Sequence, residues 1–197
     1  MPLLEVRNLV KNFGARRVVD GASFSVDPGE IVGLLGRNGA GKTTSFRMAI
    51  GMLDADEGEV HFDNRDVTQQ PMHRRARFGM GYLAQEPSVF RGMTVLENLL
   101  AVLELHEPTA AQRKNKAREL IERFGLRHKA EDLAETCSGG ERRRLEIARA
   151  MACKPRLLLL DEPFAAVDPH TVEELQGEVR RLAKNGIAIL VTDHNVQ

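Results

Sequence analysis

Short apolar runs alternate with helix-like segments along the chain. Residues 31–35, 157–160 and 187–191 are almost continuously apolar, which is typical of strands buried in a parallel sheet. Between the last two runs, apolar residues recur at helical spacing after Asp168 and Pro169, which supply a cap and a first-turn proline. Strands that alternate with helices predict an α/β fold with a mixed, largely parallel sheet.

Two regions depart from this alternation. Extended apolar positions at Leu4, Val6 and Leu9, followed by turn residues, predict an N-terminal antiparallel β subdomain. After Thr94 the apolar residues recur at helical spacing, which predicts a helical subdomain inserted at about residues 87–153. We expect residues 1–197 to form a single domain with this insertion.

A glycine-rich loop of the form G-x-x-x-x-G-K-T occupies residues 36–43, between a predicted strand and a predicted helix. Such loops turn backbone N–H groups toward phosphate oxygens, so the pattern predicts a P-loop that binds a nucleotide. We expect Lys42 to reach the β- and γ-phosphates and Thr43 to bind Mg²⁺. The alternative is a glycine-rich turn with a surface lysine. The predicted nucleotide contacts are Arg37, Asn38, Gly39, Ala40, Gly41, Lys42, Thr43 and Thr44.

Two acidic residues follow the apolar run at 157–160. In a P-loop fold, the acid at the carboxyl end of such a strand completes the Mg²⁺ shell, which assigns Asp161. Glu162 then lies beside the γ-phosphate, where it can orient and deprotonate a water molecule. The alternative is a pair of acids that faces solvent at the end of a strand.

The sequence Ser-Gly-Gly-Glu at 138–141 has two compatible interpretations. Ser138 and Glu141 fit a capping box that begins a helix. Gly139 and Gly140 leave room for a phosphate to approach the N-terminus of that helix.

These motifs, in this order and with a histidine near the end, resemble the ATP-binding subunits of ABC transporters. The resemblance runs from Leu4 to Gln197. It implies that a homodimer forms around two ATP and two Mg²⁺, each nucleotide lying between the P-loop of one subunit and the signature residues of the other. Those residues are Ser138, Gly139, Gly140 and Glu141. It also implies an ATPase that powers separate transmembrane permease subunits.

The resemblance also implies roles for residues outside these motifs, at positions that match the family pattern. Phe13 would stack on adenine, the alternative being an ordinary core residue. Gln85 would contact Mg²⁺ and the attacking water, and Asp168 would cross the dimer as well as cap a helix. His194 would contact the γ-phosphate. The predicted catalytic residues are therefore Glu162, His194, Gln85 and Lys42, and the predicted metal ligands are Thr43, Gln85 and Asp161.

Two features depart from the family pattern. Cys137 stands where the family usually has leucine, and it still offers an apolar side chain. The sequence ends at Gln197, three residues after His194, whereas family members usually continue. The chain is therefore expected to be either a fragment, truncated at its C-terminal end, or a natural short form.

Within the family, residues 82–99, 141–150, 161–169 and 192–196 resemble the ATPases of bacterial lipopolysaccharide exporters. Branched-chain amino acid importers are the alternative, as is a truncated nucleotide-binding product without transport activity. A DNA-repair or chromosome-structural ATPase would carry long coiled coils, and no sustained heptad lies between Lys42 and Ser138. Phe78, Tyr82 and Phe90 would line the site where a permease helix docks, with core packing as the alternative.

The charge balance and the hydropathy of the chain indicate which classes of partner it can bind. Lysine and arginine number 28 and aspartate and glutamate 28, so the balance disfavours nucleic-acid binding. No stretch approaches about 18 consecutive apolar residues, and we expect a cytoplasmic protein held at the inner face of the membrane by its permease. The basic clusters at 73–77 and 142–144 are expected to be solvated faces, with contact to a partner or to lipid headgroups as the alternative.

Overall fold

The computed structural model describes residues 1–36, 39–165 and 168–193. The chain divides into two compact units. The first contains Met1–Tyr82, Pro155–Pro163 and the chain from Gly177 on, and the second contains Leu83–Lys154 and Phe164–Gln176. The second unit overlaps the range 87–153 predicted as a helical insertion, and it also includes a segment that the sequence pattern did not assign to it.

An antiparallel sheet begins the first unit. Its strands are β1 (Leu4–Phe13), β2 (Arg16–Val26), β4 (Glu57–Phe62) and β5 (Arg65–Asp66), in the order β2-β1-β4-β5. Leu4 pairs with Val26 on one side and with Phe62 on the other, and all three side chains are buried. The predicted antiparallel β subdomain is therefore present.

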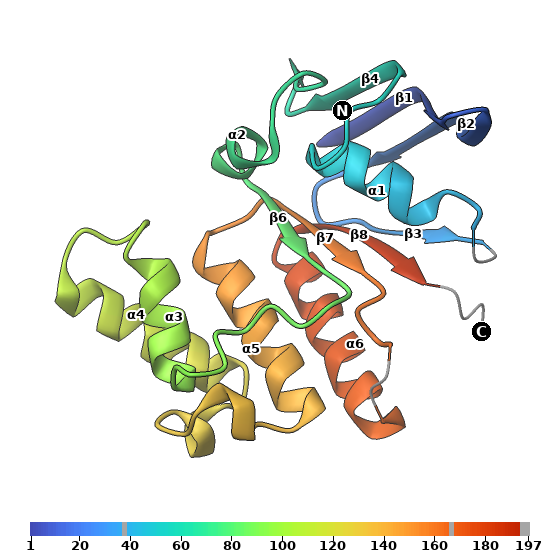
Figure 1. Cartoon of the computed structure of the whole chain (residues 1–197). Coiled ribbons are helices and arrows are strands. Elements are labelled where there is room, and N and C mark those ends of the chain that lie inside the picture. The colour runs from blue at the N-terminus through green and yellow to red at the C-terminus, as the bar shows by residue number, and fades with distance from the viewer. Residues whose placement is uncertain (37–38, 166–167, 194–197) are drawn as a thin grey trace. The chain divides into compact units, whose positions relative to one another are not determined.

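The second sheet of this unit carries the parallel strands. It contains β3 (Ile31–Leu35), β6 (Met80–Leu83), β7 (Leu157–Asp161) and β8 (Ala188–Asp193), in the order β3-β8-β7-β6 (Figure 1). β8 pairs in parallel with both β3 and β7. These two sheets with their helices confirm the predicted α/β class.

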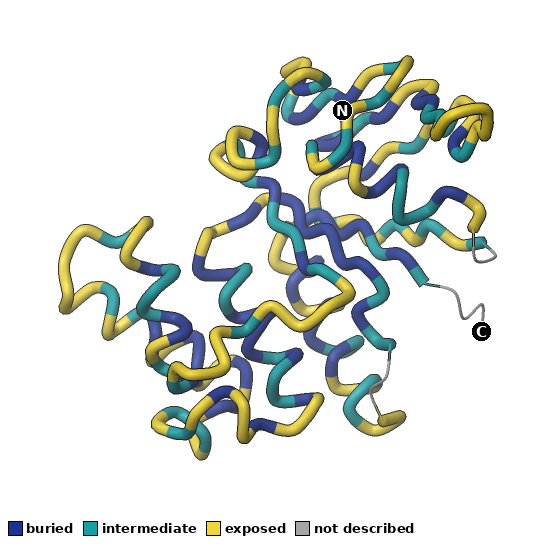
Figure 2. The backbone as a smooth tube through the Cα atoms, viewed as in Figure 1, coloured by how far each residue is buried: buried dark blue, intermediate teal, exposed yellow. Residues whose placement is uncertain are grey.

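Helix α1 (Lys42–Ile50) lies between the two sheets (Figure 1), and α2 (Met72–Arg77) follows β5. Phe46, Met48 and Ile50 of α1 are almost fully buried in one core with residues of β1, β4, β7 and β8. The central strands are buried along most of their length (Figure 2). The core therefore packs α1 against β7, the strand that ends at the predicted acid Asp161.

One strand is less buried than its sequence predicts. Residues 31–35 are apolar and were expected to form a buried strand, but Ile31 is 41% exposed and Leu35 57% exposed. β3 is the first strand in the sheet order, so among the described residues it pairs only with β8. An edge position leaves the side chains of such a strand partly open to solvent, whatever its hydropathy.

Helices make up most of the second unit. They are α3 (Val95–Leu103), α4 (Ala110–Arg123), α5 (Gly139–Ala152) and the first part of α6 (Pro169–Lys184), with short 3₁₀ turns at Arg127–Lys129 and Ala134–Thr136. The predicted cap Thr94 begins α3 through a complete capping box with Glu97. Within the described ranges, no helix combines the length and the hydrophobicity needed to cross a lipid bilayer.

The prediction that both basic clusters are solvated faces is wrong for one arginine in each. Arg75 is 2% exposed in the first unit, and Arg143 is 7% exposed in the second. Their neighbours Arg74 and Arg142 are exposed or half-buried. Each buried guanidinium has acceptors from distant parts of the chain, which a run of like charges does not reveal.

Candidate active site

The glycine-rich loop leads from the end of β3 into α1. Gly41 precedes the helix with φ of 84°, and a Cβ atom there would lie 2.6 Å from the carbonyl oxygen of Val18. Glycine is therefore required at this position both for its backbone conformation and for space. The Lys42 ammonium donates to the carbonyl of Gly36, so the lysine curls over its own loop.

The start of α1 suits an anion. Its first turn contains Lys42, Thr43 and Thr44 and no acidic residue. The partial positive charge of the helix N-terminus is therefore not cancelled by its own side chains. A hollow of about 460 Å³ adjoins this point, and Ala40, Lys42 and Ser45 contribute to its lining.

The acidic pair lies at the same edge of the parallel sheet. Leu35, the last residue of β3, pairs with Asp193, and Asp161, the last residue of β7, pairs with Thr192. Because parallel strands end at one edge, the P-loop and the two acids emerge there together. Asp161 is 1% exposed. The structure thus brings together, in the first unit, residues far apart in sequence that were predicted to act on one nucleotide.

Thr192 holds both acids. Its hydroxyl donates to Asp161 Oδ1 at 2.7 Å and accepts the Glu162 N–H at 3.0 Å. Glu162 has a positive φ of 45°, an uncommon conformation for a residue other than glycine, and the threonine hydroxyl fixes it there. The sequence pattern predicted no role for Thr192 at the site. A hydroxyl residue at the end of a predicted strand is the signal that was available.

Tyr82 is a second residue that the sequence did not place at the site. Its hydroxyl donates to Asp161 Oδ2 at 3.4 Å, and its ring lies 6.3 Å from that of Phe46. Burial, with the negative charge of Asp161 added, raises the pKa of the Tyr82 phenol, so it stays a neutral donor. Phe78 also packs against the core, so the core alternative holds for both aromatics.

The signature residues form the predicted capping box in the second unit. Ser138 Oγ accepts the Glu141 N–H at 3.2 Å, and Glu141 Oε2 accepts the Ser138 N–H at 2.7 Å. His128 Nε2 lies 2.9 Å from the other oxygen of Glu141. Burial opposes ionisation of Glu141, but the bonds from Ser138 and His128 outweigh it and lower its pKa. The N-terminus of α5 is therefore firmly set.

Thr171 links the signature to Asp168. The Thr171 N–H and hydroxyl both donate to the Asp168 carboxylate, at 3.0 and 2.6 Å, which confirms Asp168 as the cap of α6. These bonds lower the pKa of Asp168. A Cβ atom on Gly140 would lie 2.5 Å from Thr171 Cγ2, so α5 and α6 meet closely at this glycine.

We therefore expect Gly140→Ala to destabilise the protein by about 1–3 kcal/mol, the usual cost of overpacking. The Thr171 side chain cannot rotate away without losing the bond from its hydroxyl to Asp168. Unfolding midpoints in urea will measure the effect. Gly139→Ala is the matched control, because its Cβ would meet no atom within 4 Å. Thr171→Ser, which removes the clashing methyl group, should restore part of the loss, and equal midpoints for the two alanine variants would contradict the argument.

Two further predicted site residues are exposed on the protein surface, and three lie outside the described residues. Gln85 is exposed in the second unit, and Phe13 in the first is 51% exposed, so Phe13 is not a core residue. Arg37, Asn38 and His194 lie outside the described residues. His194 directly follows Asp193, the end of β8, in the sequence.

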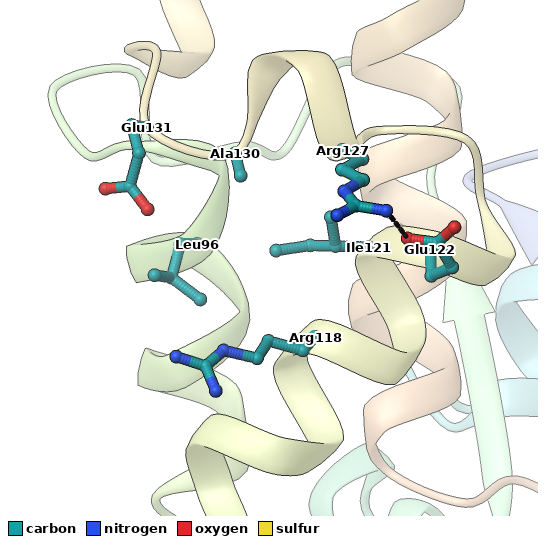
Figure 3. A pocket seen from close by; sticks show the side chains of 7 residues that line it. All are labelled: Leu96, Arg118, Ile121, Glu122, Arg127, Ala130 and Glu131. Carbon is teal, nitrogen blue, oxygen red and sulfur yellow. Dashed lines mark ion pairs between the residues drawn. The ribbon is translucent and has the colours of Figure 1, made fainter.

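A second hollow, of about 390 Å³, lies in the helical unit and holds none of these residues (Figure 3). Its lining mixes apolar and charged side chains, and Arg127 pairs with Glu122 at 3.7 Å on one side of it. Its lining residues are Leu96, Arg118, Ile121, Glu122, Arg127, Ala130 and Glu131.

The chain is similar over most of its length to proteins of a known family. Residues 19–165 match the family described as ABC transporter. The chain belongs to this family. A relative described as an ABC transporter ATP-binding protein, from Rhizobium meliloti, is 53% identical over 98% of this chain and 72% of its own length. The lipopolysaccharide export system ATP-binding protein LptB of Haemophilus influenzae is 50% identical over 100% of this chain and 82% of its own. LptB of Escherichia coli is 48% identical over the same shares.

Solved structures of ATP-binding cassettes have the same fold as this chain. An ATP-binding cassette of an ABC transporter superposes with a TM-score of 0.92 and 33% identity, covering 100% of this chain and 83% of that one. The ADP conformation of such a cassette gives a TM-score of 0.90 and 31% identity, with the same coverage. This ABC ATPase is thus an ATP-binding subunit of a transporter, and ATP hydrolysis is its reaction.

Proposed function

We propose that this ABC ATPase powers lipopolysaccharide export, by dimerising around two Mg-ATP beneath a separate permease. The observation that carries the proposal is 48–50% identity over the whole chain with proteins named for lipopolysaccharide export. Importer ATPases of the branched-chain amino acid class, the alternative from the sequence, are not favoured by these relatives.

In the proposed reaction, Lys42 and the N-terminus of α1 bind the phosphates, and Phe13 stacks on adenine. Glu162, fixed by Thr192, accepts the proton of a water molecule that attacks the γ-phosphate in line. The signature residues of a second subunit, which begin α5, would complete the site. Gln85, Asp168 and His194 keep the roles that the family resemblance gives them.

The residues fit a magnesium ion. Thr43 contributes a hydroxyl and Asp161 a buried carboxylate, which are the hard oxygen ligands that Mg²⁺ takes. The Thr192 hydroxyl donates to Asp161 Oδ1 at 2.7 Å, and hydrogen bonds of this kind orient a carboxylate ligand. When bound, Mg²⁺ supplies positive charge that offsets the charge of the phosphates. We propose Thr43 and Asp161 of the first unit as its protein ligands, and the family resemblance adds Gln85 to them.

Phe90 supports a contact with a permease. It is 45% exposed in the second unit, and the Arg149 guanidinium lies 4.3 Å from the centre of its ring. An exposed aromatic ring held by a cation offers a rigid apolar surface to a partner helix. A permease partner would hold this ABC ATPase at the inner face of the membrane, on the cytoplasmic side.

The proposed sandwich is tested by sedimentation and ATP turnover of Ser138→Arg. An arginine at the N-terminus of α5 adds bulk and positive charge where the nucleotide of the other subunit would approach. We expect the wild-type chain to dimerise with Mg-ATP and to hydrolyse it, and the variant to remain monomeric with turnover reduced at least about 100-fold, the scale of one lost donor to the transition state.

Two controls make the result specific. Equilibrium ATP binding to the Ser138→Arg monomer should persist, because the P-loop belongs to the first unit. Ser138→Ala removes the helix cap at a cost of about 1 kcal/mol without adding bulk, so it should still dimerise. An ATP-dependent dimer of Ser138→Arg would overturn the sandwich. Failure of the wild-type chain to bind ATP would overturn the assignment of Lys42.

A further inference from the structure

Residues 84–90, the Gln85 segment, lie along one face of α5 in the second unit. The Arg143 guanidinium donates to the carbonyl of Ala84 at 2.9 Å. The Ser88 N–H donates to Glu146 Oε1 at 2.6 Å. The segment is therefore held on both sides of Gln85 by side chains of one helix.

Arg143 and Glu146 are themselves a buried ion pair. Their side chains are 8% and 3% exposed, and Arg143 Nη1 lies 2.9 Å from Glu146 Oε2. The spacing of three residues places both on the same face of α5. Each charge thus has a partner of opposite sign as well as a backbone group of the Gln85 segment, an arrangement in which loss of either residue leaves a buried charge uncompensated.

Two more residues fix the rest of the segment. Arg149, one further turn along this face, donates to the Ser88 carbonyl at 2.5 Å. Asn98 of α3, which is fully buried, accepts the Phe90 N–H at 2.9 Å and donates to the Phe90 carbonyl at 3.0 Å. The backbone from Ala84 to Phe90 is thereby tied to the helices at both ends and in the middle.

We propose that the Arg143–Glu146 pair is a positioning device that makes the Gln85 segment and the signature residues move as one body. α5 begins at the signature, and a helix transmits a displacement along its axis because its backbone bonds make it stiff. A force on the segment near Phe90 then reaches Ser138 through Glu146 and Arg143. This inference rests on the proposed ATPase and transport function.

The test uses Glu146→Gln in the full chain. The amide group keeps the size of the side chain, but it can offer only one oxygen to two donors, so its NH₂ group faces either Arg143 or Ser88. We expect hydrogen exchange at residues 84–90 to quicken and kcat for ATP to fall, each at least about fivefold, the lower end of coupling between sites. The ATP affinity should stay unchanged, because the P-loop lies in the first unit.

Glu174→Gln is the matched control. It breaks another ion pair of α5, between Arg144 and Glu174 at 2.6 Å, without touching the Gln85 segment. It should leave both exchange and kcat at wild-type values. If Glu146→Gln folds poorly, Arg143→Met/Glu146→Leu replaces the pair by apolar residues of similar size, which leaves no buried charge unpaired. This double variant should show the same fast exchange and low kcat.

The outcomes separate the two proposals. Wild-type exchange at residues 84–90 together with wild-type kcat in Glu146→Gln would overturn the positioning role. If kcat falls only in proportion to the loss of folded protein, the pair serves stability alone, and the positioning role is likewise overturned. If the wild-type chain does not hydrolyse ATP, the proposed function fails, and the exchange measurement alone then decides whether the pair holds the segment.

Discussion

Replacing Glu162 with glutamine is expected to lower ATP turnover by about 10²–10⁴-fold, the usual contribution of a general base. The amide keeps the shape of the side chain but cannot take up a proton at pH 7. The backbone N–H of residue 162 should still donate to Thr192, so the acidic edge of the sheet keeps its geometry. ATP affinity should therefore stay near its wild-type value.

A dimer that cannot hydrolyse its nucleotide should accumulate. We expect Glu162→Gln to sediment as a dimer with Mg-ATP and as a monomer without it. The double variant Glu162→Gln/Ser138→Arg should stay monomeric under both conditions, which separates a nucleotide sandwich from non-specific association. Turnover of Glu162→Gln within tenfold of the wild-type rate would show that another group takes the proton.

Replacing Arg75 with methionine is expected to lower the free energy of unfolding by about 3–5 kcal/mol, because four carbonyl groups inside the protein lose their donor. The Arg75 guanidinium donates to four carbonyl groups, of Met48, Ala49, Thr68 and Gln70, at 2.7–2.9 Å. Two of these carbonyls lie in the last turn of α1, where a cation is also favoured by the helix dipole. Burial lowers the pKa of Arg75 to about 10, so the group stays charged at neutral pH.

Urea denaturation will measure this effect as a shift of midpoint. Arg77→Met is the matched control, since Arg77 lies on the same short helix and is exposed. Arg75→Lys should fall between the two, because one ammonium group keeps the charge but cannot reach four carbonyls. Equal midpoints for Arg75→Met and Arg77→Met would refute the buried role.

Much of the fold could be predicted from local pattern. The apolar run at 157–160 became the fully buried β7, and Thr94, Ser138 and Asp168 all cap helices as their neighbours predicted. These features depend on residues a few positions apart, so one sequence suffices to recognise them. The P-loop can be recognised in the same way, because its strand, its glycines and its lysine are contiguous in the sequence.

The edge position of β3 could not be predicted in this way. Its five residues are as apolar as those of a central strand, apart from Gly33. Whether a strand is central depends on which other strands pair with it, and β8 comes from the far end of the described chain. The contact between Thr192 and Asp161 could not be predicted for the same reason, since it requires the register between β7 and β8.

The sequence by itself determined the class of fold, the order of the nucleotide-binding motifs and the family, because each of these is written in short contiguous stretches. Only the tertiary structure decided which charged side chains are buried and which groups they bind. Arg75 donates to carbonyls of α1 that lie 26 and 27 residues away in the sequence, and Arg143 donates to the Ala84 carbonyl, 59 residues away. Burial of a charge is set by acceptors that the fold brings to it, and neighbouring residues in the sequence do not reveal them.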